Sequence, residues 1–362
     1  MHRRVASGAL AALASVVAWS GSAAAHVDYV TEEGAPGSMR ELLVAVFSSP
    51  TAVALLSVGG LAVLAAALGY LRFSASLPDV QVARRTLASY RPYLPWMLRL
   101  SVGLPLVGAG FAGYLFSPVV AVDARVLQVG LGFLLLFGLG TRIVAAVGLL
   151  AYLWSLAGHF PELLLASEYV AGFLGIFVVG PGQPSADMML RRMAATEGTI
   201  ANRFQGLPKP EDVLSAIGVT PGTAPVLIRV FLGANFVYLG VVQKWMQPEQ
   251  AAAVVAKYDL TAVVPVSPEL WVFGAGLTEA AVGLALLTGT FTRGAAAAAF
   301  VLLSTTLFGL PDDPVLAHIT LFGLSSALMV TGAGRFSLDA AVIPALRRRL
   351  GSQPTAPGGT SV

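Results

Sequence analysis

The chain contains no cysteine and few charged residues. Without a thiol it cannot form a disulfide, use a cysteine nucleophile or bind a metal through cysteine sulfur. Only 11% of its 362 residues are charged, against about 25% in soluble domains, and 56% are hydrophobic. Zinc motifs, phosphate loops, nucleophile elbows and dinucleotide fingerprints are also absent. No basic stripe with interleaved aromatic residues occurs outside the loops, so we expect membrane lipid, and no nucleic acid, as a partner of this chain.

Long apolar runs make up most of the sequence and predict an all-α polytopic membrane protein. A membrane-spanning helix needs about 20 apolar residues. The runs 126–139 and 169–179 fall short of that length, so we expect their polar flanks to complete them. The nine runs predicted to form helices are 51–71, 98–116, 126–139, 143–157, 169–179, 226–242, 270–287, 294–310 and 316–330.

The first 25 residues have the pattern of a secretory signal peptide. Arg3 and Arg4 form a basic start, an Ala- and Val-rich run follows, and residues 22–25 are small, as at a cleavage site. An uncleaved first helix is the alternative. Cleavage would leave His26 at the N-terminus, where its amine and imidazole can together bind copper as a metal ligand pair. A plain polar linker is the simpler interpretation, because no second His or Met cluster is near.

The order of apolar and polar segments predicts the domain organisation. One transmembrane helix precedes two four-helix units, which a polar cytoplasmic linker separates, and the chain ends in a basic, disordered cytoplasmic tail. The predicted segments are 1–25 (signal peptide), 26–49 (extracytoplasmic linker), 50–96 (first helix and cytoplasmic loop), 97–190 (first unit), 191–225 (linker), 226–340 (second unit) and 341–362 (tail).

Lysine and arginine are distributed unevenly between the two ends of the predicted helices. If the signal peptide is cleaved, the loops on the cytoplasmic side hold 16 of the 22 Lys and Arg residues. Cytoplasmic loops of membrane proteins are enriched in these residues. The distribution therefore predicts a multi-pass protein of the cell membrane, with its N-terminus outside and its C-terminus in the cytoplasm.

The two halves of the chain share a pattern of spaced residues. Each predicted unit has an even number of spans, so a duplication would give a parallel repeat of two tandem four-helix bundles. The matched sets are Arg99-Gly103-Val107-Gly110-Tyr114-Pro118 with Arg229-Gly233-Val237-Gly240-Lys244-Pro248, Gln128-Gly132-Gly138-Thr141-Arg142 with Glu279-Gly283-Gly289-Thr292-Arg293, and Gly180-Gly182-Asp187 with Gly332-Gly334-Asp339.

Glu279 lies near the middle of an apolar run and needs a charge partner, a proton or a function. A carboxylate at the centre of a membrane helix costs about 2.5–3.5 kcal/mol on insertion scales. At about 100° per residue, Lys244 and Glu279 each share a helix face with two glycines, which favour close helix packing. We therefore expect these two residues to pair. In the first half Tyr114 and Gln128 stand in their places, so both charges are missing there together.

Lys244, Glu279 and His318 are the candidate catalytic residues of a polar pocket near the outer leaflet. Asn235 and Thr278 lie near them in sequence. A structural interpretation is also open, in which the ion pair only holds two helices in register and a backbone carbonyl satisfies the histidine.

These motifs of the second half resemble the DoxX family of four-helix membrane proteins. The resemblance covers about residues 226–340, and the first half looks like a diverged copy. The residues that carry it are Arg229, Gly233, Gly240 to Lys244, Pro248, Gly276-Leu277-Thr278-Glu279, Gly283, Gly289-Thr290-Phe291-Thr292-Arg293, His318 and Gly334-Arg335-Phe336-Ser337-Leu338-Asp339.

The resemblance implies a quinone-linked redox subunit or accessory protein with partner redox subunits. The family is similar to small subunits of quinone-reducing membrane oxidoreductases. Quinone would then be the cofactor, with Lys244, Glu279 and His318 in its pocket and Asn235, Thr278 and Arg293 as further cofactor-binding candidates. A non-catalytic membrane scaffold and a transporter of small solutes or metals are the alternatives.

Overall fold

The computed structural model describes residues 37–74, 76–204 and 210–349. The predicted signal peptide, His26 and the last 13 residues of the tail lie outside the described residues. Helices, short 3₁₀ turns and one π-helical turn are the only regular elements in the described ranges, as expected for an all-α protein. The helices are α2 (Met39–Ser48), α3 (Pro50–Phe73), α4 (Pro78–Ser89), α5 (Leu94–Ala112), α6 (Arg125–Phe137), α7 (Thr141–Gly158), α8 (Glu168–Val179), α9 (Ala186–Ala194), α10 (Pro210–Ala216), α11 (Ala224–Gly240), α12 (Pro248–Lys257), α13 (Leu260–Val263), α14 (Pro268–Thr288), α15 (Thr292–Gly309), α16 (Val315–Thr331), α17 (Leu338–Ala341) and α18 (Ile343–Arg349).

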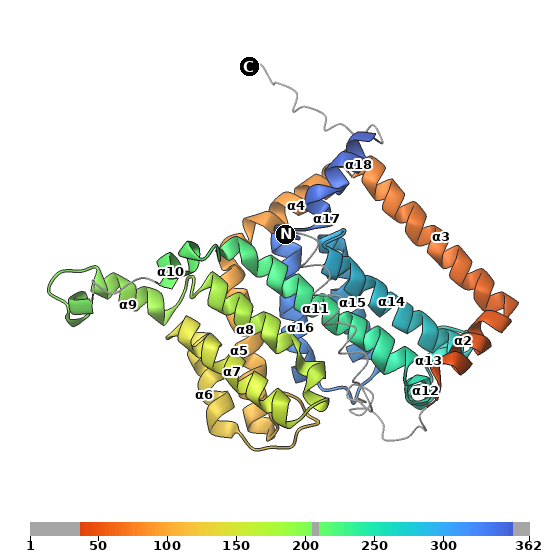
Figure 1. Ribbon diagram of the computed structural model, residues 1–362, viewed down its shortest axis with the longest axis horizontal. Coiled ribbons are helices and arrows are strands. Elements are labelled where there is room, and N and C mark those ends of the chain that lie inside the picture. Colours follow the sequence, from red (N-terminus) through yellow and green to blue (C-terminus); the bar gives the residue numbers. More distant parts are fainter. Residues whose placement is uncertain (1–36, 75, 205–209, 350–362) are drawn as a thin grey trace, which may run out of the picture.

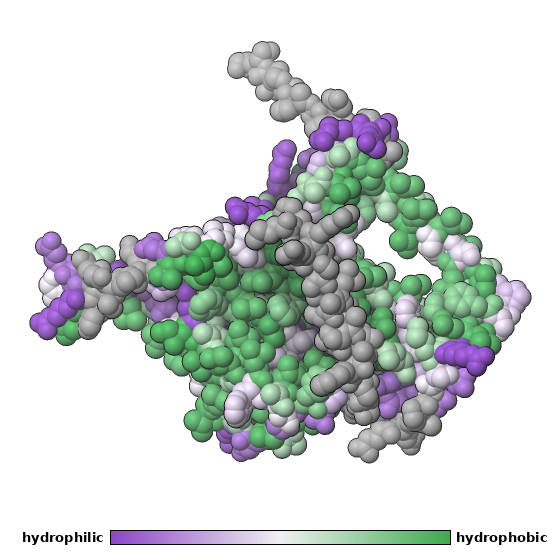
Figure 2. All heavy atoms as spheres, viewed as in Figure 1, coloured by the Kyte–Doolittle hydropathy of each residue, from purple (hydrophilic) through white to green (hydrophobic). Residues whose placement is uncertain are grey.

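Six of the described helical segments are long and apolar enough to cross a membrane. They include α3, α7, α14 and α15, the continuous α4–α5 segment, and α11 with its π-helical extension. Three shorter apolar helices, α6, α8 and α16, accompany them. Figure 2 shows hydrophobic residues over the middle of the visible face and polar residues mainly at its ends. The protein is therefore a multi-pass membrane protein, and its surface outside the end caps faces lipid.

The two halves of the chain share one hydrophobic core. Helices α5, α8, α11 and α16 lie at the centre, and each packs against a helix of the other half, α5 against α16 and α8 against α11 (Figure 1). Leu98 of α5, Phe173 of α8, Ile228 of α11 and Leu324 of α16 are fully buried in the same cluster. The predicted pair of four-helix units therefore forms a single packed body.

The first span, α3, stands apart from this body (Figure 1). Only 6% of its apolar window is buried, and Leu55, Val58 and Leu61 are each more than half exposed. It contacts α2 at one end and α18 at the other. An apolar helix without a packed face suits a lipid environment and no aqueous one.

The short helices α6 and α8 are completed by apolar loops, and our expectation of polar flanks was wrong. Thirteen residues of α6 span about 20 Å, less than the hydrocarbon core of a bilayer. Leu115 and Phe116, in the loop before α6, are 7% and 2% exposed. Leu163, in the 3₁₀ turn before α8, is fully buried. These loops pack into the core at one end of the bundle, where their backbone is covered by protein.

Two predicted polar loops contain helices. The segment 73–96, expected to be a polar loop, includes α4, and the predicted linker 191–225 includes α10. Pro78 at the first turn of α4 and Asp79 beside it are typical helix-start residues. Our reading followed only long apolar runs, and these short polar helices do not produce one.

Matching contacts occur at the same end of both halves. In each half an aspartate accepts two backbone hydrogen bonds at the start of the third helix of the unit, and an arginine of that helix donates to a carbonyl of the fourth. These matches support an internal duplication, which we propose. The aspartate contacts are Asp187 with Gly140 N (2.6 Å) and Thr141 N (2.8 Å), and Asp339 with Phe291 N (2.7 Å) and Thr292 N (2.8 Å); the arginine contacts are Arg142 Nε to Phe177 O and Arg293 Nε to Met329 O, both 2.9 Å.

Candidate functional site

Lys244 and Glu279 form an ion pair between α11 and α14. Lys244 Nζ lies 2.7 Å from Glu279 Oε2, and the two side chains are 21% and 17% exposed. Charged groups at this depth are costly unless paired, so the pair solves the problem that Glu279 poses alone. The structure thus brings together the two residues that the sequence led us to pair.

The backbone of α11 and α14 approaches closely on either side of this pair. A Cβ atom added at Gly233 would lie 2.7 Å from Gly283 O, and one added at Gly283 would lie 2.6 Å from Gly233 O. Gly240 and Gly276 make a similar close approach. Small residues allow this packing in membrane helices. The glycines therefore fix the separation of the two helices that carry the charges.

A π-helical turn holds Lys244 at the end of α11. The turn covers Val241–Trp245, and the Trp245 ring stacks on Phe273 of α14, with Nε1 donating to Phe273 O at 3.2 Å. A π-helical turn advances fewer degrees per residue than an α-helix and is often found at functional sites. Our prediction of one continuous α-helical face through Lys244 missed this change of period.

Asp313 and His318 form a second, more buried polar pair next to the first. Asp313 Oδ2 lies 3.3 Å from His318 Nε2, and the two side chains are 2% and 0% exposed. Burial raises the pKa of Asp313, although the charges of His318 and Lys244 oppose that rise. The effect of Lys244 on Asp313 shows that the two pairs belong to one polar cluster.

The tautomer of His318 follows from its other contact. His318 Nδ1 lies 3.1 Å from Pro314 O, and a carbonyl can only accept, so Nδ1 carries a hydrogen. Nε2 then either accepts a proton from a neutral Asp313 or donates one to its carboxylate. In both states the pair holds one titratable proton away from water.

Asp313 was missed by sequence reasoning, although a signal was present. It lies in Pro311-Asp312-Asp313-Pro314, five residues before His318 at the start of the last apolar run. Two acids between prolines resemble an ordinary exposed turn. Asp312 fits that description, since it pairs with Lys257 at 3.0 Å with its side chain 59% exposed, whereas Asp313 turns inward.

The first half has neutral hydrogen bonds in place of the ion pair. Gln128 is fully buried, and its amide bridges two backbone groups of the loop after α5. Its Nε2 donates to Tyr114 O at 2.6 Å, and its Oε1 accepts from Phe116 N at 2.8 Å. The predicted equivalence of Gln128 with Glu279 thus coincides with a change from a charged to an uncharged contact.

The three predicted cofactor-binding residues lie in different environments. Asn235 faces the first half, where its Nδ2 donates to Leu165 O at 2.8 Å. Thr278 is exposed and donates to Gly274 O within its own helix at 2.8 Å. Arg293 lies at the start of α15, in the turn that follows the end of α14, and binds backbone carbonyls of α16. No printed contact joins any of the three to the polar cluster within the described ranges.

Comparison with known proteins supports the predicted family. Residues 224–311 match the family model described as DoxX. No curated protein and no solved structure matches the chain. The match includes Lys244 and Glu279 and ends just before Asp313 and His318. Together with the six apolar helices, it identifies the protein as a multi-pass membrane protein of the DoxX family, with its DoxX domain in the second half of the chain.

Proposed function

We propose that this protein is a membrane subunit of a quinone-linked redox system, in which the cluster Lys244–Glu279–Asp313–His318 handles protons. The observation that supports this most directly is the 2.7 Å ion pair beside a buried carboxyl–imidazole pair. Ionisable residues inside membrane proteins often mark proton or substrate pathways. A purely structural ion pair would not require a second titratable pair next to it.

The donors of the cluster fit the chemistry of a quinone. Reduction of a quinone to a quinol takes up two electrons and two protons, and we assign the electron supply to a partner redox subunit. Quinone carbonyl oxygens accept hydrogen bonds, and Lys244 Nζ is a cationic donor that remains partly exposed. Two cavities found in the described part of the chain are lined by other residues, so the proposed contact is at the exposed edge of the ion pair.

The buried pair provides a reservoir for a proton. Asp313 Oδ1 is buried and has no hydrogen-bond partner among the described residues, which favours the neutral carboxyl. A proton at Asp313 Oδ2 can pass to His318 Nε2 across 3.3 Å without charging the site as a whole. We assign proton storage to this pair and donation to Lys244, with Glu279 restoring its charge balance.

Isosteric variants separate this role from that of a scaffold. Lys244→Met and Glu279→Gln are made singly and together, with Thr288→Val, an exposed site on α14, as a control. In lipid nanodiscs, the double variant is expected to fold like the wild type but to bind a short-chain quinone at least tenfold more weakly. The control should bind normally.

Two outcomes contradict the proposal. Unchanged quinone binding by the folded double variant would remove the redox role of the pair and leave a scaffold. Absence of binding to the wild-type protein, both alone and with the subunits that co-purify with it, would reject the quinone assignment altogether.

A further inference from the structure

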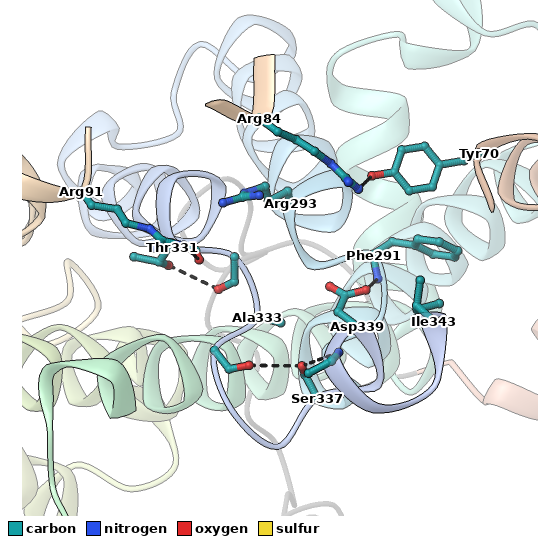
Figure 3. A pocket seen from close by; sticks show the side chains of 13 residues that line it. Tyr70, Arg84, Arg91, Phe291, Arg293, Thr331, Ala333, Ser337, Asp339 and Ile343 are labelled. Carbon is teal, nitrogen blue, oxygen red and sulfur yellow. Dashed lines mark hydrogen bonds between the residues drawn. The ribbon is translucent and has the colours of Figure 1, made fainter. Parts of the chain in front are cut away.

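A cavity of about 290 Å³ lies at the end of the bundle that carries α4 and α17, and three arginines reach it from different elements. Arg84 comes from α4, Arg91 follows that helix, and Arg293 lies at the start of α15. Figure 3 shows the three along one side of the pocket, with Ser337 and Asp339 on the other. Lysine and arginine counting predicts that this end faces the cytoplasm.

The positive charge of this pocket is not balanced by the carboxylates around it. No described carboxylate lies within 4.0 Å of Arg84, Arg91 or Arg293. Both oxygens of Asp339 already accept backbone hydrogen bonds at the start of α15. The charges of Arg91 and Arg84 both repel that of Arg293. An anion in the cavity would relieve this repulsion.

The guanidinium groups are held in place by neutral partners. Arg84 donates to the Tyr70 hydroxyl, and Arg91 donates to Thr331 O at 3.3 Å. Arg293 donates through Nε to Met329 O at 2.9 Å. Each arginine has further N–H groups, because a guanidinium carries five donors. The pocket is thus pre-organised and keeps donors available for a ligand.

The first half shows what the equivalent position receives. Arg142 corresponds to Arg293 and makes the same backbone contact with the fourth helix of its unit. It also binds Glu211 at 2.9 Å, and Arg191 binds the same carboxylate at 3.0 Å. Two arginines of the first half therefore share an anion supplied by the chain. In the second half three arginines gather without one.

We propose that the pocket between α4, α15 and α17 binds a phosphate group, supplied by an anionic phospholipid headgroup or by free phosphate. Arginine forks suit phosphate oxygens, and basic pockets between membrane helices bind anionic headgroups. Tyr70, in the last turns of the lipid-exposed span α3, forms part of the wall, so the cavity adjoins the membrane surface. This inference does not depend on the quinone proposal, because the pocket shares no residue with the polar cluster.

The test compares charge removed inside the pocket with the same charge removed outside it. The pocket variant is Arg84→Gln with Arg91→Gln, which leaves the buried contacts of Arg293 intact. The matched control is Arg85→Gln with Arg192→Gln, since both of these arginines are exposed and outside the cavity. Native mass spectrometry counts phosphatidylglycerol retained from mixed phosphatidylglycerol–phosphatidylcholine nanodiscs, and a thermal-shift titration with inorganic phosphate against chloride measures the free anion.

The expected result is retention of phosphatidylglycerol, or a phosphate-dependent rise in Tm, in the wild type and the control. The pocket variant should lose at least tenfold in apparent affinity. Retention of the lipid without a phosphate effect assigns the site to a headgroup, and the reverse assigns it to free phosphate. Equal losses in both double variants would show only a general surface charge effect and overturn the proposal, as would binding of neither probe by the wild type.

Discussion

Replacing Lys244 by methionine and Glu279 by glutamine, singly and together, measures how strongly the ion pair couples α11 to α14. At 2.7 Å and an effective dielectric of about 20, the direct attraction is about 6 kcal/mol, most of which offsets desolvation. Removing one partner of a buried pair costs about 3–5 kcal/mol. Because both side chains are about one-fifth exposed, we expect about 2–3 kcal/mol for each single change.

The double variant leaves no unpaired charge and should recover part of that loss, with a coupling energy of about 1–2 kcal/mol. Reversible unfolding in mixed detergent micelles gives the four free energies of the cycle. Lys257→Met and Asp312→Asn form the matched control, because that pair lies at 3.0 Å but is well exposed, and it should show no measurable coupling. Additive effects at Lys244 and Glu279 would refute our account of the pair.

Three further predictions concern packing and protonation. Gly283→Ala should cost about 1–3 kcal/mol because its Cβ would meet Gly233 O at 2.6 Å, whereas Gly274→Ala, with no atom within 4 Å, should be neutral or stabilising in the same unfolding assay. Partial burial opposes ionisation of Glu211, but a backbone hydrogen bond and the charges of Arg191 and Arg142 lower its pKa overall, so its contribution to stability is present above about pH 4.3 and lost below it. Hydrogen exchange of the α10 amides should show this loss of protection, and Glu211→Gln should remove the pH dependence; identical pH profiles would contradict it. Burial raises the pKa of Asp313 and the His318 charge lowers it, so the native state binds the extra proton and stability falls as pH rises from about 4 through the folded pKa. His318→Gln should extend that window upward, seen as an infrared band of protonated carboxyl that persists to higher pH than in the wild type, and an unchanged band would show that the two groups are not coupled.

Apolar run length predicted the spans well because lipid demands it directly. The predicted run 270–287 differs from α14 (Pro268–Thr288) by only two residues at its start and one at its end. The prediction that Lys244 pairs with Glu279 also agrees with the structure. Both inferences rest on the cost of polar groups in hydrocarbon, which a single sequence displays.

Features that depend on contacts distant in sequence could not be predicted in this way. The π-helical turn at Val241–Trp245 has no periodic signature of its own. Asp313 could not be told from Asp312, because only tertiary packing turns one inward and leaves the other exposed. The roles predicted for Asn235, Thr278 and Arg293 rested on nearness in sequence, which does not specify a shared pocket.

The crossed packing of the two halves also sets an order for assembly in the membrane. Thr320 Oγ1 of α16 donates to Ser101 O of α5 at 3.0 Å, and 219 residues separate these two positions. At about 5–20 residues per second, a ribosome needs about 10 to 40 seconds to reach the second of them after the first. During that interval α5 must wait in the bilayer with one side covered by lipid, so the nascent first half is the stage at which insertion factors or proteases have access to this chain.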